Sequence, residues 1–322
     1  MTTGRYTREL PPAVALVMLL LAVLVAAPSF FSAENLRDMA LNNAPVLPIA
    51  LGMTLVILVG QIDISVGSQF AVCSVVAGLL AKSGMPMPLV VVTVMVVGAA
   101  MGALNGALVG VLRLPSIIVT LAMLVAWRDA LRWATDGAWV QDLPANFQWF
   151  GLPPAVAQTL IVTLALALLA AFSWGLRNLQ AGRSVYAVGS SNEAARLAGI
   201  DPARVTFMAF AITGALVAIG AVLNAVRFSA VPSNAGMGLE LQAVAAVVVG
   251  GTAITGGRGS VFGTLIGVVL LGTIGTATTY VGISPFWGKA IQGVIILAAL
   301  VADVLVVRVT QRRIHRVGVS AD

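Results

Sequence analysis

The chain alternates between apolar runs, most of them long enough to cross a bilayer, and short polar segments that carry most of the charge. A helix needs about 20 consecutive apolar residues to span the hydrocarbon layer. Charged residues make up only 9% of the chain, whereas a soluble domain carries about 25%. The pattern predicts an all-α polytopic membrane protein with about ten transmembrane helices. The expected spans are residues 13–27, 44–61, 65–81, 88–111, 115–133, 155–175, 205–226, 241–255, 261–280 and 286–306.

Basic residues indicate the orientation of these spans, because cytoplasmic loops are enriched in Lys and Arg. With ten crossings and both termini inside, twelve of the 18 basic residues fall on the cytoplasmic side. The first run could instead be a cleavable signal peptide, since Arg5 and Arg8 precede it. Pro28 directly after Ala26 and Ala27 disfavours cleavage. We therefore expect a retained first span and both termini in the cytoplasm.

The polar loop of residues 176–204 separates a first half, residues 1–175, from a second half, residues 205–322. We expect the whole chain, residues 1–322, to form a single membrane domain. The loop carries four arginines and follows a span without charge, which places it on the cytoplasmic side.

A short helix is expected to protrude from this loop as a docking element. Ser191 or Asn192 can cap its start, and Glu193 can pair with Arg196 one turn later. Ala195 and Leu197 lie on the apolar face that we expect to enter a partner's groove. The predicted element comprises Asn192, Glu193, Ala194, Ala195, Arg196 and Leu197, with Gly199 ending it.

The second and third expected spans meet at a polar break, GQIDISVGS, at residues 60–68. A carboxylate near the hydrocarbon layer is costly, so Asp63 is expected to have a partner or a function. It could line the transport pathway, or it could cap the following helix together with Ser65; the two roles are compatible. The candidates for the pathway or its gate are Gln61, Asp63, Ser65 and Asn105.

Residues 58–68 and 248–260 share an apolar run, a glycine, a β-branched or polar stretch and a Gly-Ser ending. This weak echo predicts two pseudo-repeated halves in the same orientation, related by an axis along the membrane normal. The frequent glycines of residues 98–110 and 263–272 are explained by close helix packing.

Other classes of function find no support in the residues. The net charge of +6 comes from charges at the expected membrane edges, so we expect no nucleic-acid partner. The single histidine, His315, lies in a basic tail, and no Cys, His and carboxylate cluster suggests a metal or catalytic site. Gly257 and Arg258 replace the Gly-Lys-Ser/Thr ending of a phosphate loop, so the chain is not expected to hydrolyse ATP.

Three stretches together resemble one family, the ribose-type permeases of ATP-binding-cassette (ABC) importers. GQIDISVGS is similar to that family's GGIDLSVGS signature, GRSVYAVGSSNEAARLAGID to its cytoplasmic loop, and LQAVAAVVVGGTAITGGRGSVFGTLIG to its C-terminal half. The likeness runs from about residue 40 to residue 306. Departures occur at Gln61, where glycine is common, and at Thr252 and Ala253.

The resemblance implies a multi-pass permease subunit of a bacterial inner membrane that works by alternating access. It implies three partners: ATPase subunits, a periplasmic sugar-binding protein, and a second permease subunit that is identical or paralogous. The ATPase subunits would bind the ATP, so no cofactor is expected on this chain. Membrane lipid would surround the permease. The cytoplasmic helix at residues 192–199 would be the coupling helix to the ATPase.

The implied substrates are monosaccharides and furanosyl signalling molecules. The external segment, residues 135–154, looks more like the rhamnose or autoinducer branches. Its Trp139, Asp142 and Trp149 are candidates for contact with the binding protein, whereas anchoring at the membrane surface is the alternative for the tryptophans. The main alternative function is an ion-coupled secondary sugar transporter, which usually carries more ionisable residues in its spans.

Overall fold

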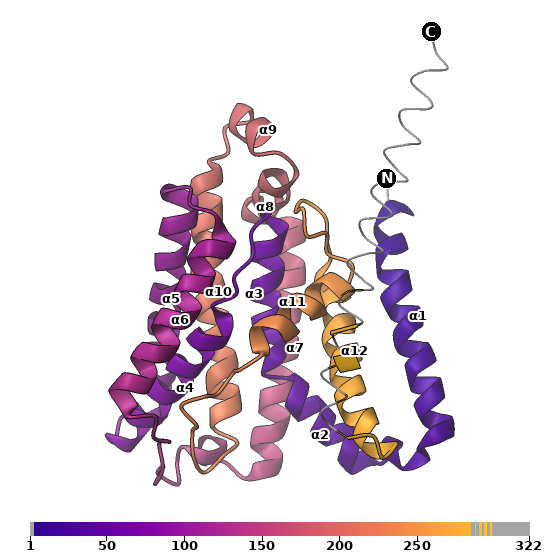
Figure 1. Ribbon diagram of the computed structural model, residues 1–322, viewed down its shortest axis with the longest axis vertical. Coiled ribbons are helices and arrows are strands. Elements are labelled where there is room, and N and C mark those ends of the chain that lie inside the picture. The colour runs from indigo at the N-terminus through magenta and orange to yellow at the C-terminus, as the bar shows by residue number, and fades with distance from the viewer. Residues whose placement is uncertain (1–2, 285–286, 288–289, 292, 295–296, 298–322) are drawn as a thin grey trace.

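The computed structural model describes residues 3–284 together with residues 287, 290–291, 293–294 and 297. Its helices lie largely side by side, and one short helix projects from one end of the bundle (Figure 1). The helices are α1 (Thr3–Ala26), α2 (Ala33–Asn43), α3 (Val46–Leu58), α4 (Val66–Lys82), α5 (Met87–Gly106), α6 (Ser116–Thr135), α7 (Pro154–Asn178), α8 (Gln180–Ser190), α9 (Asn192–Leu197), α10 (Pro202–Ala225), α11 (Leu239–Val249) and α12 (Val261–Tyr280).

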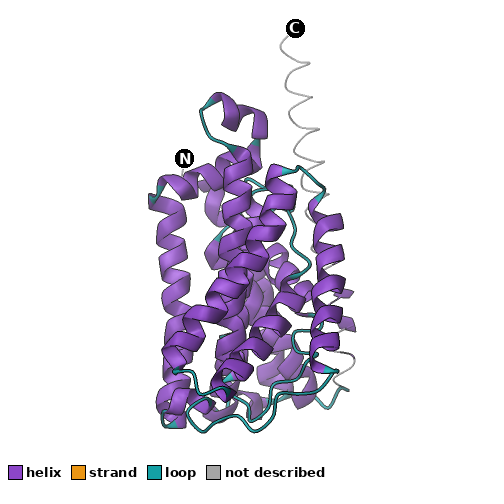
Figure 2. Ribbon diagram, turned by 90° about the vertical axis from the view of Figure 1, so that its left-hand side faces the viewer, coloured by secondary structure: helices purple, strands orange, loops and turns teal. Residues whose placement is uncertain are grey.

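We call the end from which α9 projects the α9 end. The opposite end, where the long loops gather (Figure 2), is called the loop end. The loop end holds residues 136–147 and 226–238, which precede the turn at Gln148–Gly151 and helix α11. Segments that the sequence places on one side of the membrane therefore lie at one end of the bundle.

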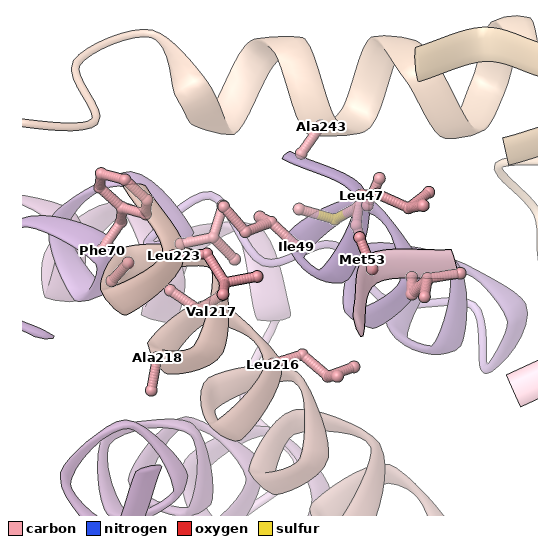
Figure 3. Close-up of a cluster of buried hydrophobic side chains, with 14 of the residues drawn as sticks. Leu47, Ile49, Met53, Phe70, Leu216, Val217, Ala218, Leu223 and Ala243 are labelled. Carbon is pink, nitrogen blue, oxygen red and sulfur yellow. The ribbon is translucent and has the colours of Figure 1, made fainter. Parts of the chain in front are cut away.

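The core is centred on α3 and α10. Every residue of α3 from Leu47 to Leu58 is buried, and α10 contributes side chains such as Leu216 and Val217 to the same cluster (Figure 3). The two helices run antiparallel, because Gly52 packs against Thr213 at the middle of both helices, whereas the Pro45 carbonyl at the start of α3 packs against Gly220 nearer the end of α10.

Glycines allow α5 to approach α10 closely. A Cβ at Gly98 would overlap the Gly214 carbonyl, and a Cβ at Gly102 would overlap the Phe210 carbonyl. Gly110, in the π-helical continuation of α5 (Ala107–Val111), packs in the same way against Ala203. The predicted role of this glycine series in helix packing is confirmed.

Apolar side chains also cover the outer surface, including Val92 and Val96 of α5 and Ile118 of α6, which are 56%, 63% and 65% exposed. A water-soluble protein rarely exposes so much apolar surface. These faces suit contact with lipid, in agreement with a polytopic membrane protein.

Not every expected span is confirmed as a full crossing. Five of the described helices are long and apolar enough to span a membrane, and α2 with α3, bent by 42°, would make a sixth. α4 and α11 have only 17 and 11 residues, and Figure 1 shows both starting part-way along the bundle. Complete spans at residues 65–81 and 241–255 are therefore not confirmed. The span expected at residues 286–306 lies largely outside the described residues.

The predicted relation between the halves also needs correction. The two polar breaks do lie together, with Gly256 against Gly60, but α12 begins at the α9 end whereas α4 begins inside the bundle. The counterpart of α4 is α11, because each follows a core helix, α3 or α10, and a non-helical return into the interior. α4 runs to the loop end and α11 to the α9 end, so these two units are inverted and do not share one orientation.

Candidate functional site

The break after α3 brings a group of polar side chains into the interior. α3 ends at Leu58, Gly60 adopts a positive φ of 78°, and the chain turns back to start α4 at Val66. Asp63 and Ser65 are completely buried on this return, and Asn105 of α5 is completely buried opposite them. The structure thus brings three of the four pathway candidates together.

Hydrogen bonds join this group into one network. One carboxylate oxygen of Asp63 accepts the Ser65 backbone N–H at 2.9 Å and the Ser65 hydroxyl. Asn105 donates its amide to the Ser65 hydroxyl at 2.8 Å and to Asp63 at 3.5 Å. The Asp63 carboxylate also lies before the first turn of α4, where the helix dipole favours a negative charge.

Gln69 completes the network. Its amide donates to the second Asp63 oxygen at 3.1 Å and to the Ser65 hydroxyl at 2.9 Å. Gln69 is not among the residues predicted from the sequence, although its spacing of four from Ser65 puts both on one face of a helix. Gln61, the remaining candidate, is half-buried and has no part in these hydrogen bonds.

The first turn of α11 meets the first turn of α4. A Cβ at Gly67 would overlap the carboxylate of Glu240 and would approach the Gly236 carbonyl to 2.7 Å. Only glycine therefore fits where the two half-helices touch. Two helix N-termini converge in the middle of the bundle, an arrangement that presents backbone N–H groups near the same point.

Helix α9 has the boundaries that the sequence predicts. The Ser191 hydroxyl accepts the Ala194 backbone N–H at 3.2 Å, so Ser191 is the cap and Asn192 the first helical residue. Gly199 follows the helix with a φ of 78°, and Leu197 is 87% exposed. The helix presents an apolar side chain to its surroundings and not to the bundle.

Two details of α9 differ from the expectation. Ala195 is only 2% exposed, so it packs beneath the helix and cannot belong to a docking face. Glu193 and Arg196 form neither of the two ion pairs found among the described residues, which are Lys82–Asp142 and Arg132–Asp129. Both charged side chains remain exposed.

α8 connects α9 to both polar breaks. A Cβ at Gly189 would overlap the Leu58 carbonyl at the end of α3, and it would lie 2.5 Å from the Gly257 backbone nitrogen. The Gly257 N–H itself donates to the Leu58 carbonyl at 2.9 Å. A displacement of α9 and α8 would therefore be transmitted by direct backbone contact to the end of α3 and to the segment before α12.

The two long segments at the loop end form one surface. Val140 and Val231 exchange backbone hydrogen bonds of 2.9 and 3.0 Å. Trp139 is 55% exposed, and Asp142 is exposed beside Lys82 at 3.9 Å. Trp149 is half-buried and packs against the core, so it offers less surface to a partner than Trp139 does.

The family of branched-chain amino acid transport system permease components matches residues 35–300 of the chain. The chain belongs to this permease family. Residues 35–300 include the interior network, α9 and the surface at the loop end. Among the described residues of the permease, no group of three or more His, Cys, Asp or Glu side chains could hold a metal ion.

Proteins similar to the permease carry the name autoinducer 2 import system permease protein LsrC. The one from Enterobacter sp. (strain 638) is 33% identical over 303 residues, which cover 94% of this chain and 88% of that protein. Those from Escherichia coli (strain K12 / DH10B) and Salmonella typhi are both 32% identical, covering 92% and 96% of this chain and 86% and 89% of theirs. No solved structure matches the permease.

Proposed function

We propose that this permease is the membrane subunit of an ABC importer that carries a small sugar-like solute into the cytoplasm. The names of its relatives, which describe import of autoinducer 2, favour that solute class over the other monosaccharides. Separate ATPase subunits supply the energy, and a binding protein delivers the solute at the loop end. A second permease subunit completes the pathway.

The observation that carries this proposal is the exposed helix α9. A side chain such as Leu197, which is 87% exposed, is costly to leave in water and suits a groove on a partner. In this proposal the α9 end faces the cytoplasm and α9 is the coupling helix, whose exposed residues, all of 192–197 except Ala195, contact the ATPase. Gly199 ends it and lets the chain enter α10.

Movement of α9 would be transmitted through α8. Because Gly189 packs directly on Leu58 and Gly257, a shift of α8 would press on the end of α3 and displace the break between α11 and α12. The half-helices α4 and α11 would then change their positions relative to each other. This opens the interior first to one side and then to the other, as alternating access requires.

Asp63 would act on the position of α4 more than on the solute. Its side chain is completely buried and engaged by Ser65, Gln69 and Asn105. The network sets where the first turn of α4 lies, and a solute would meet the surface that this turn helps to form. Gln61, half-buried at the start of the return, is the candidate that can face a solute without breaking the network.

The proposal is tested by replacing Leu197 with aspartate and co-purifying the ATPase subunit with the permease. We expect at least a tenfold loss of recovered ATPase, because a charge at the centre of an apolar contact is costly. Uptake of autoinducer 2 by cells should fall by a similar factor. The matched control is Leu36→Asp on α2, a side chain that is 45% exposed near the loop end.

Equal recovery of the ATPase by wild type and Leu197→Asp would refute the coupling assignment. Uptake that persists without any ATPase subunit, and that stops when the proton gradient is dissipated, would support an ion-coupled transporter instead.

A further inference from the structure

A cavity of about 560 Å³ lies at the α9 end, between α1, the junction of α7 with α8, and the segment before α12. Three arginines line it: Arg177, Arg183 and Arg258. Glu9 of α1 is the one carboxylate among the lining residues, so positive charge exceeds negative charge in the cavity by two. The transport mechanism proposed above does not use this cavity.

The fold holds these arginines together. Gly182 packs against the Leu176 backbone, so the chain turns sharply from α7 into α8 and brings Arg177 and Arg183 to one wall. The Tyr186 hydroxyl donates to the Gly259 carbonyl at 3.1 Å, which fixes the segment carrying Arg258 to α8. The cavity is thus built by long-range contacts.

The arginines have no acidic partner in the described part of the chain. Neither of the two ion pairs found there includes Arg177, Arg183 or Arg258. Three guanidinium groups around one cavity repel one another unless an anion lies between them. Arginine pairs especially well with phosphate, because its planar fork can donate two parallel hydrogen bonds.

Exposed aromatic side chains near the cavity indicate a place at the depth of the lipid headgroups. The Arg177 guanidinium lies over the Phe262 ring, 5.6 Å from its centroid, and Phe262 is 43% exposed in the first turn of α12. Trp174, one turn before Arg177 on α7, is 60% exposed. Exposed aromatic side chains next to arginines mark the boundary between hydrocarbon and headgroups in membrane proteins.

We propose that this cavity binds the phosphate of an anionic phospholipid, with Arg177, Arg183 and Arg258 as its ligands. The acyl chains would extend out of the cavity past Phe262 and Trp174 into the hydrocarbon layer of the membrane. Free phosphate offers the same anionic group, but it gains nothing from Phe262 and Trp174. The inference does not depend on the solute or on ATPase coupling.

The test uses the full-length permease, delipidated in detergent, and native mass spectrometry to count bound short-chain lipid. Dioctanoyl phosphatidylglycerol should bind as one saturable copy, whereas dioctanoyl phosphatidylcholine should not saturate the site. Inorganic phosphate in excess should compete weakly. The double variant Arg183→Gln/Arg258→Gln should raise the phosphatidylglycerol concentration for half occupancy about 25-fold, since each arginine near the surface contributes about fivefold.

The matched control is Arg113→Gln/Arg204→Gln, which removes the same charge from exposed positions outside the cavity and should bind as wild type does. A third variant, Arg183→Lys/Arg258→Lys, keeps the charge and should retain most of the affinity even if the glutamine variant folds poorly. Equal loss in the control, or equal binding of both lipids, would overturn the proposal. Full competition by inorganic phosphate would also overturn it. So would a glutamine variant that binds phosphatidylglycerol as wild type does and loses only the ATPase subunit.

Discussion

The first turns of α4 and α11 meet inside the bundle, yet they are held in different ways. Before α4, the Asp63 carboxylate accepts hydrogen bonds on both oxygens, from Ser65, Gln69 and Asn105. In α11, Glu240 accepts only the Gly238 backbone N–H, at 3.2 Å on one oxygen, and its other oxygen is buried without a hydrogen-bond partner. At the start of α4 both carboxylate oxygens have partners, although the side-chain oxygens of Gln69 and Asn105 do not; at the start of α11 only one carboxylate oxygen has a partner.

This difference assigns different mechanical roles to the two half-helices. A buried carboxylate with several donors resists displacement, because any shift leaves those donors without an acceptor. The α11 start has few such bonds to lose, and Gly236 and Gly238 before it adopt positive φ values of 71° and 84°. We therefore expect α4 to be the fixed wall of the pathway and α11 the wall that moves.

Asp63→Leu should have the largest effect. Leucine is close to aspartate in size but accepts no hydrogen bond, so the buried N–H and O–H of Ser65 lose their acceptor at about 1–3 kcal/mol each, and Gln69 and Asn105 keep only the Ser65 hydroxyl as a partner. The free energy of unfolding should fall by about 3 kcal/mol or more. Thermal unfolding of the detergent-solubilised permease, followed by size-exclusion chromatography, measures the change.

Asp63→Asn is the matched control, because it keeps one oxygen for Ser65 and Asn105. The Gln69 side-chain oxygen, which has no partner now, can turn to accept from the new amide. This variant should therefore fold, and any loss of uptake in it reports the charge itself. Wild-type unfolding of Asp63→Leu would show that the network does not hold α4.

Gly67→Ala should have the next largest effect, since it separates the two first turns. The added Cβ would overlap Glu240 and crowd the Gly236 carbonyl, and overpacking of this kind costs about 1–3 kcal/mol. Gly275→Ala on α12 is the control, because a Cβ there would meet nothing within 4 Å. If both variants unfold at the same temperature, the contact between α4 and α11 is not tight.

The sequence predicts elements that depend on local chemistry. Helix α9 follows from a serine cap and a glycine stop within nine residues, Ser191 to Gly199, and the packing glycines of α5 follow from their spacing of four. The half-helices could not be predicted in the same way. In the sequence, an apolar stretch of 17 residues such as α4 looks like a short span. The place in the bundle where α4 begins depends on a contact with residues distant in the sequence, that of Gly67 with Gly236 and Glu240.

The interior site was predicted in part for the same reason. Asp63 and Asn105 stand out because polar groups are costly within apolar segments, but Gln69 required the helical register of α4, counted from Ser65. The inverted relation of α4 and α11 is invisible in residue similarity, since their first turns, VGSQ and LELQ, share little sequence. Matching the breaks by sequence therefore paired the wrong elements.

Glu240→Gln should have the smallest effect, and its size decides whether the start of α11 is loosely held. The substitution keeps the oxygen that accepts the Gly238 N–H and turns the unpartnered oxygen into a donor near the Gly236 carbonyl. The free energy of unfolding should change by less than about 1 kcal/mol. Glu34→Gln is the matched control, because Glu34 also lies in the first turn of a helix, α2, and loses the same interaction with the helix dipole. A loss as large as that of Asp63→Leu would mean that the Glu240 carboxylate is held by a charge, for which Arg128 of α6 lies within electrostatic range. In that case Arg128→Gln should destabilise the permease equally, and α11 would be a second fixed wall.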